Sequence, residues 1–273
     1  MSDSTVAGRG ALGRPTRRAE TADQVELPPH RFAGLVAPAV DRAFVAGMLA
    51  GRDGGGAELS SRYGGPAATG FLVEFRTRLA VPGGTVDGPG FAAITRYRDP
   101  AACQRALDKQ VAYGMLQRVP GGGCCATDRG LAFLGELFGV HAEVTEELWA
   151  GHDDRVERLV SALGRVLAYA LLLTGDDEPG AFAAMAPPHE PDGTPPGVLL
   201  LNRLGTLRYH RADAHAAAWT AAGHTATSIA ELPPGPERLA IEQETDRRAA
   251  GPYTVLTAEE RLAVLADLAA LPG

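Results

Sequence analysis

The chain has 273 residues, of which 45% are hydrophobic, and it carries a formal net charge of −7. This length and apolar content allow one large or two small packed domains and exclude a chain that is disordered throughout. The acidic balance is opposite to the usual footprint of a general nucleic-acid binder, although a local basic surface is compatible with it. The three cysteines form neither a disulfide framework nor a zinc pattern, so we expect a reduced, cytoplasmic protein without metal or cofactor.

The first 28 residues differ in composition from the rest. They are rich in Gly, Ser, Thr, Pro and Arg and lack the apolar stretch of a secretory signal, so we expect a disordered tail over 1–28. We also find no apolar run near the roughly 20 residues that a membrane-spanning helix needs, and therefore expect no membrane partner.

Helical periodicity and helix-breaking residues predict the elements that follow. We expect helices over 30–51 and 66–79, the second ended by Pro82 and the glycines after it, and then a loop over 84–90. A short helix follows over 91–97. Asp99 and Pro100 predict the start of another helix, because aspartate caps helix N-termini and proline suits the first helical position.

A helix, a hairpin and a second helix are expected between residues 100 and 140. The helix from Pro100 leads into a strand over 115–119, a glycine turn, a returning strand over 124–127 and a helix capped by Thr127 and Asp128. This is the order of a winged helix-turn-helix unit, in which the helix before the hairpin can enter a DNA major groove. The alternative is that this helix does not bind DNA, since the solvent-exposed face of any helix would carry a similar set of polar residues. The candidate DNA-contacting residues are Gln104, Arg105, Lys109, Arg118 and Arg129.

The second half of the chain is predicted to be helical. A long helix over 153–175 is expected to fill a core or to form a dimer seam, and a linker rich in Pro and Gly follows over 177–197. Helices are then expected over 198–223, 237–250 and 257–273. The last opens with a capping box, Thr257 to Glu260, and presents an apolar stripe of Leu262, Leu265 and Leu268.

We therefore predict a mainly α fold with a small β-hairpin wing, a winged helix-turn-helix unit and a C-terminal helical portion. The predicted division is a disordered tail over 1–28, N-terminal helices with the winged-helix unit over 29–150, and a long connecting helix with the C-terminal portion over 151–273.

Two segments resemble MarR-type regulators. QVAYGMLQRVPGGGCCATDRGLAFLGEL (110–137) is similar to their recognition helix, wing and following helix, and LTAEERLAVLADLAAL (256–271) is similar to their dimerisation helix. LRYHRADAHAAAWTAAG (207–223) and ETDRRAAGPYTVL (244–256) resemble more closely a poorly characterised actinobacterial MarR-like helix-turn-helix family that carries an HRxDxH stretch. The resemblance implies a homodimer that binds duplex DNA and responds to a ligand. Relatives place a second winged helix where this chain has only 224–237.

The helix predicted over 198–223 carries several charged and titratable side chains in and beside the sequence HRADAH (His210–His215). Arg208, Arg211 and His215 fall within about 60° of one another on a helical wheel, among apolar neighbours, and His210 lies at the edge of this face. Because a buried arginine without a partner is costly, the face must meet carboxylates or an anionic ligand. We expect Asp213 to orient His210. The candidate internal partners of the arginines are Glu157, Glu242 and Glu244.

Three interpretations of this stretch stay open: a structural ion-pair network, a catalytic acid–base site, and a pocket for a small anion. The residues of such a pocket would be Arg208, His210, Arg211, Asp213 and His215. For the whole chain, the first hypothesis is a ligand-responsive, DNA-binding transcriptional regulator. The alternative is a member of the same fold that does not bind DNA and binds or transforms a small anionic metabolite through the HRADAH helix.

Overall fold

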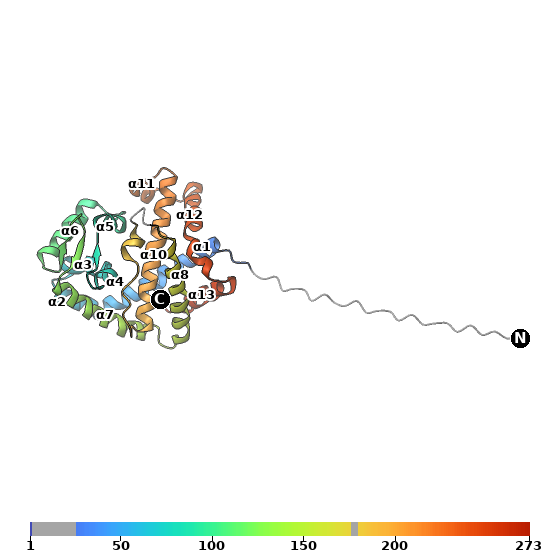
Figure 1. The fold of residues 1–273 in the computed structure, drawn as a ribbon, viewed down its shortest axis with the longest axis horizontal. Helices are drawn as coiled ribbons and strands as arrows, with labels where there is room; N and C mark the ends of the chain where they lie inside the picture. Colours follow the sequence, from blue (N-terminus) through green and yellow to red (C-terminus); the bar gives the residue numbers. More distant parts are fainter. Residues whose placement is uncertain (2–25, 176–179) are drawn as a thin grey trace.

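The computed structural model describes Met1, residues 26–175 and residues 180–273. The tail predicted over 1–28 therefore lies almost entirely outside the described residues. Figure 1 shows a mainly helical molecule in which α10 (Pro196–Ala221) runs through the middle, with a small sheet on one side of it and a group of long helices on the other. The described side chains form two main hydrophobic cores, one on each side of α10.

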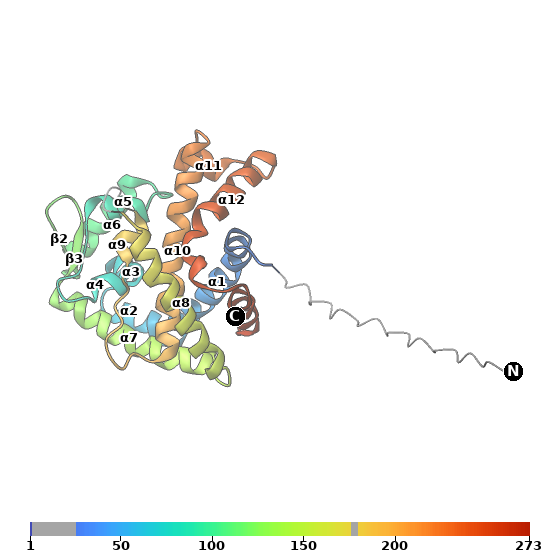
Figure 2. The ribbon, with the colours of Figure 1, turned by 45° about the vertical axis from the view of Figure 1, so that its right-hand side comes forward.

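The first of these, the helical core, contains large side chains such as Phe32, Leu159, Leu163 and Leu268, all fully buried. Figure 2 shows three helices of this core beside α10, namely α1 (Pro29–Gly51), α8 (Asp153–Leu173) and α12 (Pro236–Ala249). The 3₁₀ turn η2 (Gly251–Val255) and α13 (Ala258–Ala270) complete the core by packing on α1 and α8. Because the apolar stripe of α8 is buried within the chain, α8 fills a core, which was one of the two alternatives for it.

The second core, the sheet-side core, packs around three short antiparallel strands. These are β1 (Thr85–Val86), β2 (Leu116–Arg118) and β3 (Cys124–Ala126), in the order β1-β3-β2, with Thr85 paired to Cys125 and Leu116 paired to Ala126. The β2–β3 hairpin was predicted, whereas β1 lies in the expected loop. The helices that contribute to this core are α2 (Ala57–Arg62), α3 (Pro66–Glu74), α4 (Arg76–Leu79), α5 (Gly88–Ile94), α6 (Pro100–Ala112) and α7 (Asp128–Leu148).

Helix α10 joins the two cores because one of its faces packs in the helical core and the other contacts the sheet-side core. Leu204 and Leu207 are buried in the helical core, whereas Tyr209 packs against both cores. The short helix α9 (Ala181–Met185) lies against α10 and closes the sheet-side core with Met185. At its far end α10 packs on α11 (Ala226–Glu231) and α12 through a small apolar cluster.

The predicted helix starts are confirmed where the signal is local. The carboxylate of Asp99 accepts from the backbone N–H groups of Ala101 and Ala102 at 3.0 and 3.2 Å, and the hydroxyl of Thr127 accepts from Gly130. The capping box between Thr257 and Glu260 has both of its hydrogen bonds. These bonds satisfy N–H groups that have no partner inside the helix.

Some predicted boundaries are wrong. The helix expected over 66–79 is broken at Phe75, which leaves the helical region (φ −97°, ψ 16°) so that its ring is fully buried beside Phe71 and Phe91. The helix expected over 30–51 does end at Gly51, but a π-helical turn that was not predicted, Arg52–Gly56, follows it directly, and Gly55 in this turn has φ 123°. Only glycine adopts that conformation without strain.

One further expectation in the second half is wrong, because the linker expected over 177–197 contains α9. Of the predicted stripe on α13, Leu268 is fully buried, Leu265 packs partly against the helical core and Leu262 is 41% exposed. The residues of α13 that are buried are Arg261, Val264, Asp267 and Leu268.

The division at residue 150 stays a prediction, but α1 packs with the C-terminal helices, so the helical core contains residues of both proposed segments.

The continuous helical run Pro29–Arg62 is long and apolar enough to cross a membrane by length and composition, which we did not expect. Since one face of it is buried against the helical core, this property is equally that of a core helix, and the cytoplasmic location stays a prediction.

Candidate functional site

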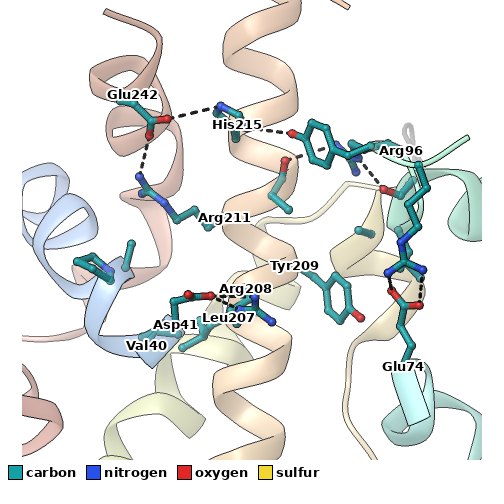
Figure 3. A pocket seen from close by; sticks show the side chains of 18 of the residues that line it. Val40, Asp41, Glu74, Arg96, Leu207, Arg208, Tyr209, Arg211, His215 and Glu242 are labelled. Atoms are coloured by element: carbon teal, nitrogen blue, oxygen red, sulfur yellow. Dashed lines mark hydrogen bonds and ion pairs between the residues drawn. The ribbon is translucent and has the colours of Figure 1, made fainter. Parts of the chain in front are cut away.

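Arg208 and Arg211 of α10 are bound to carboxylates of two other helices (Figure 3). Nε of Arg208 donates to Oδ1 of Asp41 on α1 at 2.8 Å, and its guanidinium lies 4.5 Å from the centre of the Phe44 ring. Arg211 donates to Asp246 at 2.8 Å and to Glu242 at 3.4 Å, both on α12. The cationic face of α10 therefore has counter-ions within the protein.

One of the three carboxylates proposed as internal partners is confirmed. Glu242 pairs with Arg211, whereas Glu244 pairs with Arg247 and Arg248 of its own helix, and Glu157 lines a different cavity, near Trp149. Asp41 and Asp246 were not expected, because their proximity to α10 arises only from the packing of α1 and α12 against it.

His215 lies between the sheet-side core and α12. Its Nδ1 is 2.9 Å from the hydroxyl of Tyr97, in the turn after α5, and its Nε2 is 3.7 Å from Glu242. Burial lowers the pKa of His215, and the neighbouring Glu242 opposes that shift only in part, so the ring is neutral at pH 7. The neutral imidazole therefore connects α10 to the turn after α5 through one hydrogen bond, with Tyr97.

Asp213 has a different role from the one predicted. Its carboxylate binds Arg96 and accepts from the backbone N–H groups of Ala181 and Phe182 at 3.0 and 2.8 Å, at the start of α9. The expectation that Asp213 orients His210 is wrong, because its oxygens are occupied by these partners. His210 instead packs edge-on against Phe182 at 5.4 Å, and its buried Nδ1 has no hydrogen-bond partner among the described residues.

Two cavities flank α10 beside this network. The larger, of about 550 Å³, is lined by residues that include Asp41, Arg208, Arg211 and His215. The smaller, of about 370 Å³, lies against Phe44, Arg76, Asn202 and Tyr209. Burial lowers the pKa of Arg76 to about 10, which leaves it protonated at neutral pH. No signal in the sequence singled out Arg76, since it resembles any surface arginine of a short helix.

Four of the five candidate DNA-contacting residues lie on α6 or on the neighbouring strand β2. Gln104, Arg105 and Lys109 are exposed on α6. Arg105 lies 3.6 Å from Asp99, and Arg118 of β2 donates to Asp108 at 2.6 Å, so two of the cations are partly neutralised. Lys109 forms no ion pair with the residues that the structure describes.

Arg129 is less available than the residues of α6. Its guanidinium lies 5.8 Å from the centre of the Tyr63 ring and donates to the carbonyls of Tyr113 and Tyr63 at 3.4 and 3.5 Å. It would have to leave these contacts to reach a phosphate.

Comparison of the chain with protein-family models, with curated proteins and with solved structures found no match. The resemblance to MarR-type regulators therefore stays a prediction. Across residues 26–175 and 180–273, no group of three or more His, Cys, Asp or Glu side chains is placed to hold a metal ion.

Proposed function

We propose that this chain is a winged-helix regulator that binds duplex DNA through α6 and the β2–β3 hairpin. The observation that carries this is the order α5, α6, β2, β3, with β1 added as the third strand beside β3. In a winged helix-turn-helix unit the helix before the hairpin is the one that enters the major groove. In this chain that helix is α6.

The orientation of α6 supports this function. Its inner face is buried through Cys103 and Leu107, and the side chain of Gln110 accepts from the backbone N–H of Phe71 at 3.1 Å. Gln104, Arg105 and Lys109 are therefore held on the outer face of a helix that is fixed to the core. A fixed helix with polar residues outward can present side chains to base edges and phosphates.

The charge of this surface predicts weak binding by one copy of the chain. Asp99 and Asp108 compensate Arg105 and Arg118, so few positive charges are free to replace counter-ions on the phosphates. We propose that a homodimer supplies the remaining affinity, since two linked half-site contacts raise the effective concentration of the second.

The test is binding of the full chain to duplex DNA, of random and of own-promoter sequence, across a salt series. The double variant Arg105→Ala/Lys109→Ala should lower the affinity and reduce the slope of log K against log salt by about two. Arg165→Ala/Arg247→Ala is the matched control, because it removes two exposed arginines that pair with Glu260 and Glu244, away from α6. Equal loss in both variants, or no binding at low salt, would exclude this function.

The alternative function, binding of a small anion through the HRADAH helix, is supported by the cavity of about 550 Å³ beside Arg211 and His215. The carboxylates of Glu242 and Asp246 occupy the donors of Arg211, however, so an anion would have to displace them. Helix α10 also borders the cavity of about 370 Å³, where Arg76 has no carboxylate partner among the described residues.

A further inference from the structure

Arg76 is a partly buried cation that has no carboxylate partner among the residues that the structure describes. Its Nε is buried and has no hydrogen-bond partner among the described residues, and one guanidinium nitrogen donates to the carbonyl of Val73 at 3.3 Å. No carboxylate of residues 26–175 or 180–273 forms an ion pair with it, and the ionisable groups that act on its charge are Tyr209 and Arg208. An uncompensated buried charge is costly, and a neighbouring arginine increases that cost.

The other enclosed arginines are satisfied within the chain. Arg203 binds Glu190 through three contacts of 2.6 to 3.1 Å, and Arg96 binds Asp213. Arg261, which is 8% exposed, has no carboxylate but donates to the backbone carbonyls of Leu27, Tyr253 and Leu256. Arg76 thus differs from the arginines in comparable surroundings, and the space beside it explains the difference.

The cavity of about 370 Å³ that Arg76 lines lies between α1, the α3–α4 segment and α10. The guanidinium groups of Arg76 and Arg208 lie 5.7 and 4.5 Å from the centre of the same Phe44 ring, so both cations reach this space. Figure 3 shows Tyr209 between Arg208 and Glu74. Burial raises the pKa of Tyr209 to about 12, so its hydroxyl keeps its proton and can donate.

We infer that this cavity, the Arg76 cavity, binds a small organic acid with one carboxylate and an apolar body. The charge balance sets the number of carboxylates. Arg98 is matched by Glu74 through two bonds of 2.6 and 2.8 Å, and Arg208 is matched by Asp41, so one positive charge, that of Arg76, is left over. A guanidinium fork suits a planar carboxylate.

The residues that line the Arg76 cavity indicate the chemistry of the part of the ligand that is not the carboxylate. Phe44, Met48 and Val73 offer apolar surface, and Asn202 and Tyr209 offer polar groups. An apolar body against the first three gains from leaving water, while the carboxylate faces Arg76. A phosphate ion would bring more than one negative charge and no apolar body. The site is separate from α6 and does not depend on DNA binding.

The experiment compares cyclohexanecarboxylate with its neutral amide, cyclohexanecarboxamide, by isothermal titration calorimetry of the full chain. The acid should bind and the amide should bind about tenfold to a hundredfold more weakly, because the amide carries no negative charge to pair with Arg76 and has only one acceptor oxygen. Equal affinities, no binding of the acid, or binding of inorganic phosphate in preference to the acid would each overturn the assignment. This comparison needs no variant.

Arg76→Met tests the residue, because methionine keeps much of the length and removes the charge. We expect loss of acid binding together with a melting temperature of the free protein equal to or above that of the wild type, since an unpaired buried charge has been removed. Arg78→Met is the matched control, because Arg78 lies on the same short helix and, within the described part of the chain, donates only to the carbonyl of Thr85 at 3.0 Å. Retained acid binding by Arg76→Met, or loss of binding in Arg78→Met to the same extent, would contradict the assignment.

Discussion

The hydroxyl of Tyr97 lies 2.9 Å from Nδ1 of His215, and it accepts a hydrogen bond from Nε1 of Trp219 at 3.1 Å. Two aromatic residues of the HRADAH helix are thus attached to one phenol in the turn that connects α5 to α6. Because burial keeps His215 neutral, its Nδ1 can accept a hydrogen bond from the hydroxyl of Tyr97. The position of α6 relative to α10 is therefore linked to the state of one imidazole.

Tyr97→Phe removes both hydrogen bonds of the hydroxyl, to His215 and from Trp219, and should lower the free energy of unfolding by about 1–3 kcal/mol, since each bond usually contributes about 0.5–1.5 kcal/mol net. The phenyl ring is retained, so the change reports the hydroxyl alone. Urea unfolding would measure it, with Tyr113→Phe as the control, since Tyr113 is similarly exposed and its hydroxyl makes no hydrogen bond in the described part of the chain. A Tyr113→Phe variant that lost as much stability would show that the Tyr97–His215 bond contributes nothing.

Acid should weaken the contact between α8 and α13. Arg158 donates to Asp267 at 2.8 and 2.9 Å, and Arg155 donates to it at 3.0 Å. The guanidinium of Arg158 holds the pKa of Asp267 below its usual value of 3.8, against the opposing effect of burial. A carboxyl with a depressed pKa stabilises the fold above the unfolded pKa, and this contribution is lost as the pH falls through the folded pKa.

Asp267→Asn should therefore lower the free energy of unfolding at pH 7, by about 1–3 kcal/mol. The difference from the wild type should shrink below about pH 4, because the wild-type carboxyl is then protonated in the unfolded chain and increasingly in the folded one. Urea unfolding at pH 7, 5 and 3 would measure this. Asp192→Asn, at an exposed position, should show no pH-dependent difference. A constant difference for Asp267→Asn across this range would contradict the assignment.

The carboxylate of Asp108 should limit DNA binding. It occupies the guanidinium of Arg118 at 2.6 Å and adds negative charge beside Lys109. Asp108→Asn should tighten binding and make the slope of log K against log salt steeper by about one, because a further cation can then displace counter-ions. Glu143→Gln removes the same charge from an exposed position of α7 and controls for the net charge of the chain. Equal gains in both variants would mean that Arg118 makes no phosphate contact.

Close contact between α1 and α10 depends on glycine. A Cβ on Gly205 would lie 2.8 Å from the ring of Phe44, and a Cβ on Gly47 would lie 2.7 Å from the side chain of Leu201. Gly205→Ala should cost about 1–3 kcal/mol, because this interior is already filled. Gly135→Ala, in the interior of α7 with no neighbour within 4 Å, should raise stability by about 0.5–1 kcal/mol through helix propensity. Thermal unfolding of both variants would measure the two opposite signs, and a neutral Gly205→Ala would show that the helices can move apart.

Features that depend on nearby residues in the chain were predictable. The caps at Asp99, Thr127 and Thr257 follow from residue types within three positions, and the β2–β3 hairpin follows from two short strands around a glycine turn. Helix α9 carries no such signal. Its first N–H groups are satisfied by Asp213, about thirty residues further along the chain, so its start depends on the placement of α10.

The candidate site was predictable only in part. The clustering of Arg208, Arg211 and His215 on one face follows from helical geometry, and the need for carboxylate partners follows from the cost of buried charge. The partners depend on which helices pack against α10, and only Glu242 was among those proposed. Arg76 was not predictable, because its isolation from carboxylates results from the contact of two segments far apart in sequence.

The distribution of the two cores along the chain has a consequence for biosynthesis. The sheet-side core is formed almost entirely by residues between Leu59 and Leu137, so its contacts become available soon after that stretch leaves the ribosome. The helical core combines Leu27 to Ala43 with residues from Trp149 onward. Helix α1 is therefore synthesised about a hundred residues before most of its apolar partners, so its apolar face stays uncovered on the nascent chain until they emerge.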